Sequence, residues 1–205
     1  MAPMTTPDTD EDLLIRIHSG DEQAFVSLYR KRQASIFRFA LHMGGSEALA
    51  EDITQEVFLA VIRDGCGFDP ARGTLSGYLY GIARKLMLRH IERGRLDVTL
   101  ESDLKETALP ELAVEDDPLV DLTHREGIEA LRRAVLALPR RYREVVVLCD
   151  LQEVDYAEAA GILGCPIGTV RSRLHRARAL LLEKLTKERH TRPAVPTLKP
   201  ARCLI

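Results

Sequence analysis

The segment Asp155–Leu182 carries the side chains of this chain that are best suited to binding an anionic polymer. At about 100° per residue, its second half places four polar side chains on one face of a helix, opposite an apolar stripe. These four are Arg171, Ser172, His175 and Arg176. Arginine presents a planar fork of donors that fits guanine edges and phosphates, and serine and histidine are short enough for close contacts. The competing interpretation is a solvated basic face without a ligand.

Two short helices joined by a tight turn must position this face. Asp155 is a good N-cap for a helix over about 156–163, and Gly164 can end that helix. A second helix is predicted to open near Gly168 and Thr169, and Thr169 can cap it and leave N–H groups near a phosphate. The sequence form over 155–178 is therefore that of a helix-turn-helix, whose second helix can enter a major groove.

Helical periodicity extends through most of the chain, and strand-like alternation is absent. Further helices are expected over about 10–18, 21–43, 46–63, 74–93, 124–138 and 140–148. The predicted fold is all-α, with two small helical domains joined by an acidic flexible linker. The predicted boundaries are 10–93 for the first domain, 94–123 for the linker, 124–189 for the second domain and 190–205 for a disordered tail.

The formal net charge of −2 conceals a strong segregation of charge along the chain. Residues 94–124 hold two basic and nine acidic side chains, whereas residues 169–189 hold seven basic and two acidic ones. A basic helix beyond an acidic connector indicates a local anion-binding surface rather than a generally basic protein. The connector could itself mimic nucleic acid, and a solvated disordered connector explains its charge equally well.

The sequence offers no pattern for a metal, a cofactor or catalysis. Its four cysteines are too scattered for a CxxC pair or a zinc pattern, so buried or incidental thiols in a reducing cytoplasm are expected. There is no Gly-rich phosphate loop, HExxH motif or nucleophile elbow. No transmembrane span or signal peptide is recognised. We therefore expect no cofactor, no metal, no membrane insertion and no enzymatic activity.

Both predicted domains, in this order, resemble the bacterial sigma-70 family, specifically its short extracytoplasmic-function (ECF, group IV) members. The residues that carry the resemblance in the first domain are DEQAFVSLY (21–29), AEDITQEVFLAV (50–61) and TLSGYLYGIARKLMLRHI (74–91). In the second domain they are ALPRRYREVVVL (137–148), DYAEAAGILG (155–164) and GTVRSRLHRAR (168–178). Two matching domains around an acidic linker are far more specific than a lone helix-turn-helix.

The resemblance implies a sigma factor, a dissociable initiation subunit of bacterial RNA polymerase. In this family the first domain, region 2, binds the clamp helices of the largest polymerase subunit and melts the −10 promoter element. The second domain, region 4, binds the −35 element and the flap of the second-largest subunit. The implied partners are therefore core RNA polymerase and promoter DNA.

The fourth helix and the loop before it, about 65–74, are the part that captures the separated −10 strand in this family. The −10 contacts implied here are Tyr78, Arg84, Lys85 and Arg89. Family members usually carry tryptophan where Tyr78 stands, and often asparagine where Lys85 stands. Because lysine donates hydrogen bonds but cannot accept them, the −10 sequence preference is left open.

The resemblance assigns two further sets of residues. Those implied to bind core polymerase are Asp52, Gln55, Glu56 and Phe58. Those implied to bind the −35 element are Thr169, Arg171, Ser172, Arg173, His175 and Arg176, with Arg173 nearer the rim. An ordinary solvated helix face is the alternative for each set when it is considered without the resemblance.

An operator-binding repressor or activator is the main competing function, and an enzyme or a helical adaptor has less support. A repressor would account for the helix-turn-helix but would leave AEDITQEVFLAV unexplained. The resemblance also implies control by an anti-sigma factor, a role in stress response and a cytoplasmic location. An anti-sigma factor could hold the protein at the inner membrane.

Overall fold

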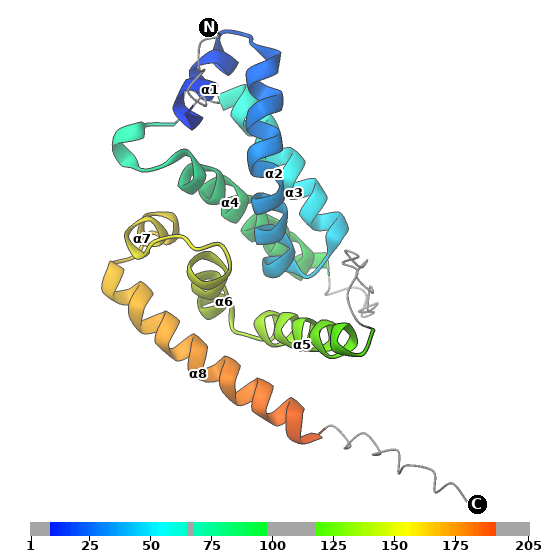
Figure 1. Cartoon of the computed structure of the whole chain (residues 1–205). Coiled ribbons are helices and arrows are strands. Elements are labelled where there is room, and N and C mark those ends of the chain that lie inside the picture. The colour runs from blue at the N-terminus through cyan, green and yellow to red at the C-terminus, as the bar shows by residue number, and fades with distance from the viewer. Residues whose placement is uncertain (1–8, 65–67, 98–117, 192–205) are drawn as a thin grey trace, which may run out of the picture.

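The computed structural model describes residues 9–64, 68–97 and 118–191, and these are built mainly from helices (Figure 1). The N-terminal lobe comprises α1 (Asp10–His18), α2 (Glu22–Gly44), α3 (Glu47–Asp64) and α4 (Leu75–Asp97). The C-terminal lobe comprises α5 (Pro118–Leu136), α6 (Arg140–Val146), α7 (Tyr156–Leu163) and α8 (Ile167–Thr191). No strand occurs in the described ranges, and the all-α prediction is confirmed.

Side-chain caps set the starts of the N-terminal helices. The Asp21 carboxylate accepts hydrogen bonds from the backbone N–H groups of Gln23 and Ala24, at 2.9 and 3.2 Å. The Ser46 hydroxyl accepts from the Leu49 N–H at 3.3 Å, at the start of α3. The short 3-10 helix η2 (Pro70–Arg72) precedes α4, whose first turn is capped by Thr74. Each cap satisfies N–H groups that have no partner inside their own helix.

The core of the N-terminal lobe lies where α2 packs against α3 and α4. The largest side chains buried there include Leu28, Ile36, Phe39, Val57 and Leu79. The ring of Phe39 lies 5.4 Å from the ring of Tyr80, centroid to centroid. A second aromatic cluster joins α2 to α3, because Phe58 packs edge-on against Phe25 and Tyr29. The first contact packs α4 against α2, and the second packs α3 against α2.

Helix α4 buries a wider face than its sequence predicts. Helical periodicity over 74–93 predicts an apolar stripe of Leu75, Leu79, Ile82 and Leu86, but the last two are only half-buried. The structure instead buries Tyr80 and also Ala83 and Met87. The reason is that α4 packs on two sides, against α2 and α3 of its own lobe and against α7 of the other lobe. Periodicity along one helix predicts a single buried face, and it does not indicate a second face that a distant part of the chain buries.

The two lobes are in direct contact (Figure 1). Arg143 of α6 donates a 2.7 Å hydrogen bond to the Met43 carbonyl at the end of α2. The same guanidinium donates to the carbonyls of Leu136 and Leu138, at the end of α5. Burial lowers the pKa of Arg143, although the adjacent Glu144 opposes that shift. One cation therefore serves carbonyls that the helix ends leave without partners.

Three helix bounds beside the predicted linker and tail differ from those predicted. α4 continues to Asp97 and α5 begins at Pro118, so both helices extend into the predicted linker, 94–123. A proline is tolerated in the first turn of a helix, where its missing N–H would be unpaired in any case. α8 continues to Thr191, into the predicted tail. The remainder of the linker, 98–117, and of the tail, 192–205, lies outside the described residues.

Replacing Phe39 with alanine should lower the free energy of unfolding by about 3–5 kcal/mol, because its ring is fully buried between α2 and α4. Urea unfolding followed by circular dichroism measures the change. The matched control is Leu182→Ala, since Leu182 is 69% exposed and should change stability little. Equal losses in the two variants would contradict this account of the core.

Candidate nucleic-acid interface

Helices α7 and α8 form the predicted helix-turn-helix. The Asp155 carboxylate accepts from the N–H groups of Ala157 and Glu158 at 2.8 Å, which starts α7. Gly164 ends α7 in the left-handed conformation, with φ of 64°. Behind the exposed face of α8, the buried stripe consists of Val170, Leu174, Ala177 and Leu181. The cap, the turn and the stripe expected from the sequence are all confirmed.

The start of α8 differs from the prediction. The Pro166 carbonyl accepts from the N–H groups of Thr169 and Val170, at 2.8 and 3.2 Å, so the helix begins at Ile167. Thr169 is therefore inside the first turn, and its predicted capping role is wrong. The Ser172 hydroxyl donates to the Thr169 carbonyl at 3.0 Å. The Pro166 carbonyl thus supplies the first hydrogen-bond acceptor of the new helix.

The four polar side chains predicted to share a face are all exposed on α8. Helix α8 itself lies on the side of the C-terminal lobe that is turned away from α1–α4 (Figure 1). Arg171 lies over the ring of Tyr156, 5.9 Å from its centroid. A hydrogen bond from Arg176 lowers the pKa of the Tyr142 hydroxyl. The two arginines are thus held by aromatic neighbours while remaining open to solvent, which lowers the entropy cost of presenting them to a ligand.

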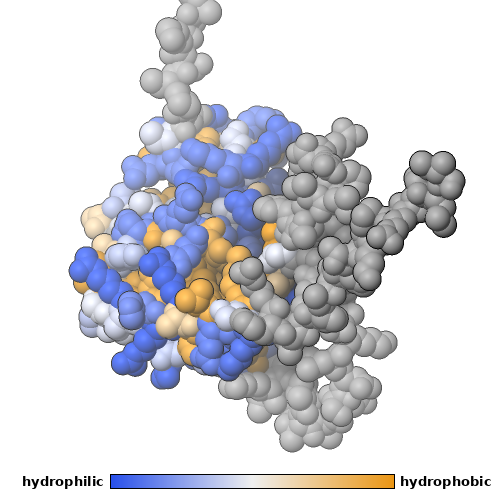
Figure 2. Space-filling model, turned by 60° about the horizontal axis from the view of Figure 1, so that its bottom comes forward, coloured by the Kyte–Doolittle hydropathy of each residue, from blue (hydrophilic) through white to orange (hydrophobic). Residues whose placement is uncertain are grey.

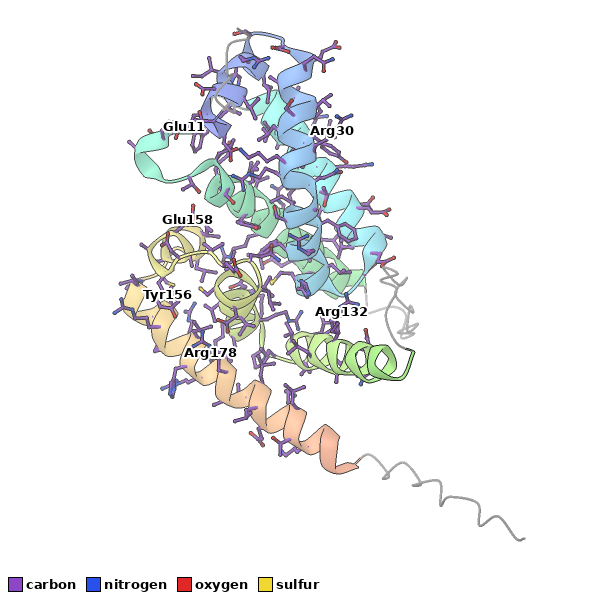
Figure 3. The ribbon with its side chains drawn as sticks, in the orientation of Figure 1. Glu11, Arg30, Arg132, Tyr156, Glu158 and Arg178 are labelled. Carbon is purple, nitrogen blue, oxygen red and sulfur yellow. The ribbon has the colours of Figure 1, made fainter. Side chains whose placement is uncertain are left out.

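Two other arginines of α8 have structural partners. Arg178 forms a two-pronged ion pair with Asp150, at 2.6 and 3.0 Å, and this contact raises the pKa of Arg178. Asp150 belongs to the π-helix η3 (Val147–Leu151), which continues α6. Figure 3 shows Arg178 and Tyr156 on the same side of the C-terminal lobe. Arg173 is half-buried with one nitrogen 4.0 Å from the Cys165 sulfur, which agrees with a position at the rim.

The residues predicted to contact the −10 element are spread around α4. Lys85 and Arg89 are exposed on one side. The Tyr78 ring is half-buried and packs on Phe68, with centroids 5.7 Å apart. Arg84 points into the contact between the lobes, where its Nε lies 3.3 Å from Oε1 of Glu144. In this arrangement Lys85 and Arg89 are accessible to a ligand, and Arg84 is occupied by the other lobe.

The residues predicted to bind polymerase divide into two kinds. Asp52, Gln55 and Glu56 are exposed on one face of α3. Phe58 is 2% exposed and lies in the aromatic cluster with Phe25 and Tyr29. Its predicted contact with a partner is therefore corrected to a packing role, because a helix turns by about 100° per residue and places Phe58 well away from Asp52.

The exposed face of α3 contains two apolar residues that sequence reasoning missed. Leu59 is 44% exposed and Ile62 is 52% exposed. Both follow the polar group Asp52, Gln55 and Glu56 at helical spacing. The available signal was an apolar run, LAVI, longer than one buried stripe requires. An acidic start followed by an apolar end is a surface suited to a partner with basic and apolar side chains.

The C-terminal lobe also exposes apolar side chains. Figure 2, in which the bottom of Figure 1 comes forward, shows apolar residues gathered among polar ones. The exposed large apolar residues of α5 and α8 are Ile128, Leu131, Ile167 and Leu182. Such gathering on a protein surface often marks a site for a protein partner.

The described residues contain no group of three His, Cys, Asp or Glu side chains that could hold a metal ion. Burial, reinforced by the nearby Asp150 carboxylate, raises the pKa of the Cys149 thiol to about 11. The thiol is therefore protonated at neutral pH, and this fits packing better than reactivity.

None of the helices in the described ranges is long and apolar enough to cross a membrane.

The fold and the exposed basic face define a two-lobed helical protein with a helix-turn-helix in its C-terminal lobe. Residues 28–96 match the family model for sigma-70 region 2, and residues 128–181 match that for sigma-70 region 4. The chain is 30% identical over 178 residues to the ECF RNA polymerase sigma factor SigW of Bacillus subtilis, covering 83% of this chain and 93% of that protein. It is 35% identical to the ECF sigma factor SigE of Mycolicibacterium smegmatis over 82% of this chain, and spans 65% of that longer protein.

A solved structure has the same fold. The sigma factor RpoE of Bartonella quintana, in complex with the anti-sigma factor NepR, matches with a TM-score of 0.65 at 24% identity, covering 80% of this chain and 98% of that one. The protein belongs to the ECF sigma factors of the sigma-70 family. It is thus a transcription-initiation subunit of bacterial RNA polymerase, and the recognition made from its sequence motifs is confirmed.

Replacing Gly164 with alanine should destabilise the protein by about 1–2 kcal/mol, because the turn between α7 and α8 needs a left-handed residue. Urea unfolding measures the change. Gly161→Ala is the matched control, since Gly161 lies within α7 and an added methyl group meets no atom within 4 Å. The control should be neutral or slightly stabilising. A loss in Gly161→Ala as large as in Gly164→Ala would count against the role given to the turn.

Proposed function

We propose that α8 reads the −35 element of a promoter through Arg171, Ser172, His175 and Arg176, with Arg173 at the rim. The observation that carries this proposal is their common exposure on one face, above a fully packed stripe. Thr169, in the first turn, would lie near the DNA backbone, where the unpaired N–H groups of a helix start favour a phosphate. A helix supported in this way can enter a major groove without rearranging the lobe.

The N-terminal lobe supplies the second DNA contact in this proposal. Lys85 and Arg89 of α4 would track phosphates of the separated −10 strand, and Tyr78 would hold the preceding loop through its packing on Phe68. Arg84 would join them once it is released from Glu144. The division into region 2, 10–93, and region 4, 124–189, is the domain organisation that this proposal requires.

The polymerase contacts follow from the two partly apolar surfaces. Asp52, Gln55 and Glu56, extended by Leu59 and Ile62, would bind the clamp helices of core polymerase. The exposed apolar side chains of α5 and α8 would bind the flap. Both DNA contacts would then be held on one large partner, which raises their effective concentration at the promoter.

The protein would act without catalysis of its own, in the cytoplasm where polymerase and promoter DNA are found. Control by an anti-sigma factor is part of the proposal, because the similar RpoE chain was solved with the anti-sigma factor NepR. Run-off transcription with purified core polymerase tests the function directly. Initiation from defined start sites supports it, whereas DNA binding without initiation would favour the repressor alternative.

Arg171→Ala should weaken promoter binding by the reconstituted holoenzyme by about 1–3 kcal/mol if Arg171 contacts a base edge. Footprinting over the −35 element measures the loss. Lys187→Ala is the matched control, because it removes the same charge from the same helix more than four turns further on. Unchanged protection of the −35 element in Arg171→Ala would remove this residue from the assignment.

Glu56→Lys should reduce the affinity for core polymerase by roughly 10-fold or more, since charge reversal opposes basic residues on a partner surface. Fluorescence titration of labelled protein with core polymerase measures the affinity. Glu11→Lys makes the same change at an exposed site on α1 (Figure 3) and should bind as the native chain does. If both variants bind equally well, the face of α3 is not the polymerase contact.

A further inference from the structure

One face of α4 is covered by the C-terminal lobe. Thr74, at the start of α4, donates a hydrogen bond from its hydroxyl to the Glu158 carboxylate of α7. The Tyr80 hydroxyl donates to the Gln152 side-chain oxygen at 3.1 Å. Further along, Arg84 lies against Glu144 and its guanidinium reaches the Ile162 carbonyl at 3.5 Å. The contacts thus recur along a single stripe of α4.

Two carboxylates of the C-terminal lobe meet this stripe at its electropositive points. Glu158 lies at the start of α4, where unpaired N–H groups and the helix dipole favour negative charge. Figure 3 shows it between α7 and the start of α4. Glu144, which is 4% exposed, lies beside the Arg84 guanidinium. A helix start and an arginine are also the features that bind phosphate groups.

Gly77 allows the close approach of Glu158. A methyl group at this position would lie 2.5 Å from Oε1 of Glu158, which is too close without movement of that carboxylate. Gly77 sits in the first turn of α4, where alanine would be the better helix former. The residue therefore costs helix stability while leaving space for an anionic group beside the first turn.

We propose that Glu144 and Glu158 form an intramolecular mask, in which two carboxylates occupy the face of α4 that would otherwise receive nucleic-acid phosphates. The inference rests on the proposed function, in which α4 binds the separated −10 strand. In the free protein, Arg84 and the start of α4 are then covered, while Lys85, Arg89 and the exposed face of α8 remain open to DNA. Undocking of the lobes exposes Arg84 and the start of α4 together.

Promoter geometry requires the same undocking. The −10 and −35 elements are about 25 base pairs apart, or about 85 Å at 3.4 Å per pair. In the docked arrangement α4 contacts α7, and α8 follows α7 after three residues. α7 is only about 12 Å long at 1.5 Å per residue, so the docked lobes cannot reach both elements of straight DNA.

The contact is also built to open. Within the described residues, Nε2 of Gln152 has no hydrogen-bond partner, and neither Arg84 Nε nor Glu144 Oε1 has one of acceptable geometry, although the latter two attract each other across 3.3 Å. Buried polar atoms without hydrogen bonds weaken an interface, because they lose water without full compensation. The docked state is therefore specific in its pairing but is not tightly sealed.

The test uses the full chain and two kinds of variant. The Glu144→Gln/Glu158→Gln double variant removes both charges with little change of shape, and Gly77→Ala displaces the Glu158 carboxylate while favouring the helix. Glu183→Gln, on the exposed side of α8, is the charge-matched control. Small-angle scattering measures the radius of gyration. Fluorescence anisotropy measures binding of a mixed-sequence single-stranded DNA of about 20 nucleotides, long enough to cover α4.

We expect both kinds of variant to expand and to bind the single strand more tightly, by about 10-fold if the open state is about one tenth populated in the native chain. Adding Lys85→Ala and Arg89→Ala to the double variant should abolish that gain, which places it on α4 rather than α8. Unchanged dimensions in both variants would overturn the mask, and so would expansion without tighter binding. Circular dichroism verifies that each variant retains its helices.

Run-off transcription separates this inference from the proposed function. If the native chain gives no initiation with core polymerase, the proposed function fails, and scattering still decides whether the carboxylates hold the lobes together. If the native chain initiates and the variants match it in dimensions and in single-strand binding, the mask alone is wrong.

Discussion

Helix α4 packs against both lobes of the protein, and the buried ion pair of Arg84 with Glu144 joins the two lobes. A buried charge is costly unless it is paired, so Glu144 at 4% exposure favours a position of the C-terminal lobe that places it beside Arg84. The neighbouring Arg143 reinforces this position by donating to carbonyls from both lobes. These two adjacent residues act together with the Thr74–Glu158 and Tyr80–Gln152 hydrogen bonds to hold α5–α8 on the N-terminal lobe.

Much of the fold could be predicted because local signals agree with the tertiary structure. Asp155 and Gly164 define α7 through a cap and a left-handed turn, and both act within a few residues of where they stand. The buried stripe of α8 follows from periodicity alone, since Val170 and Leu174 face a single packing partner surface. Resemblance to a family then supplied what such local patterns cannot, the pairing of this motif with polymerase.

The errors have a common physical origin in contacts between distant parts of the chain. Arg84 reads as one member of a solvated basic stripe until Glu144, sixty residues away, is placed beside it. Phe58 was assigned to a surface through its motif, although the aromatic cluster with Tyr29 buries it. Thr169 is not a cap, because the helix begins earlier and the Pro166 carbonyl accepts the first hydrogen bonds. Where the helix begins depends on the geometry of the turn and not on composition.

The continuity of α8 has a mechanical consequence. The helix runs without interruption from Ile167 to Thr191, so the arginines near its start and the exposed Leu182 near its end belong to one rod about 37 Å long. The ion pair of Arg178 with Asp150 clamps that rod near its middle. A tilt imposed at either end is therefore transmitted to the other as in a lever, so that the angle at which α8 meets DNA and the surface it offers at its far end are adjusted together.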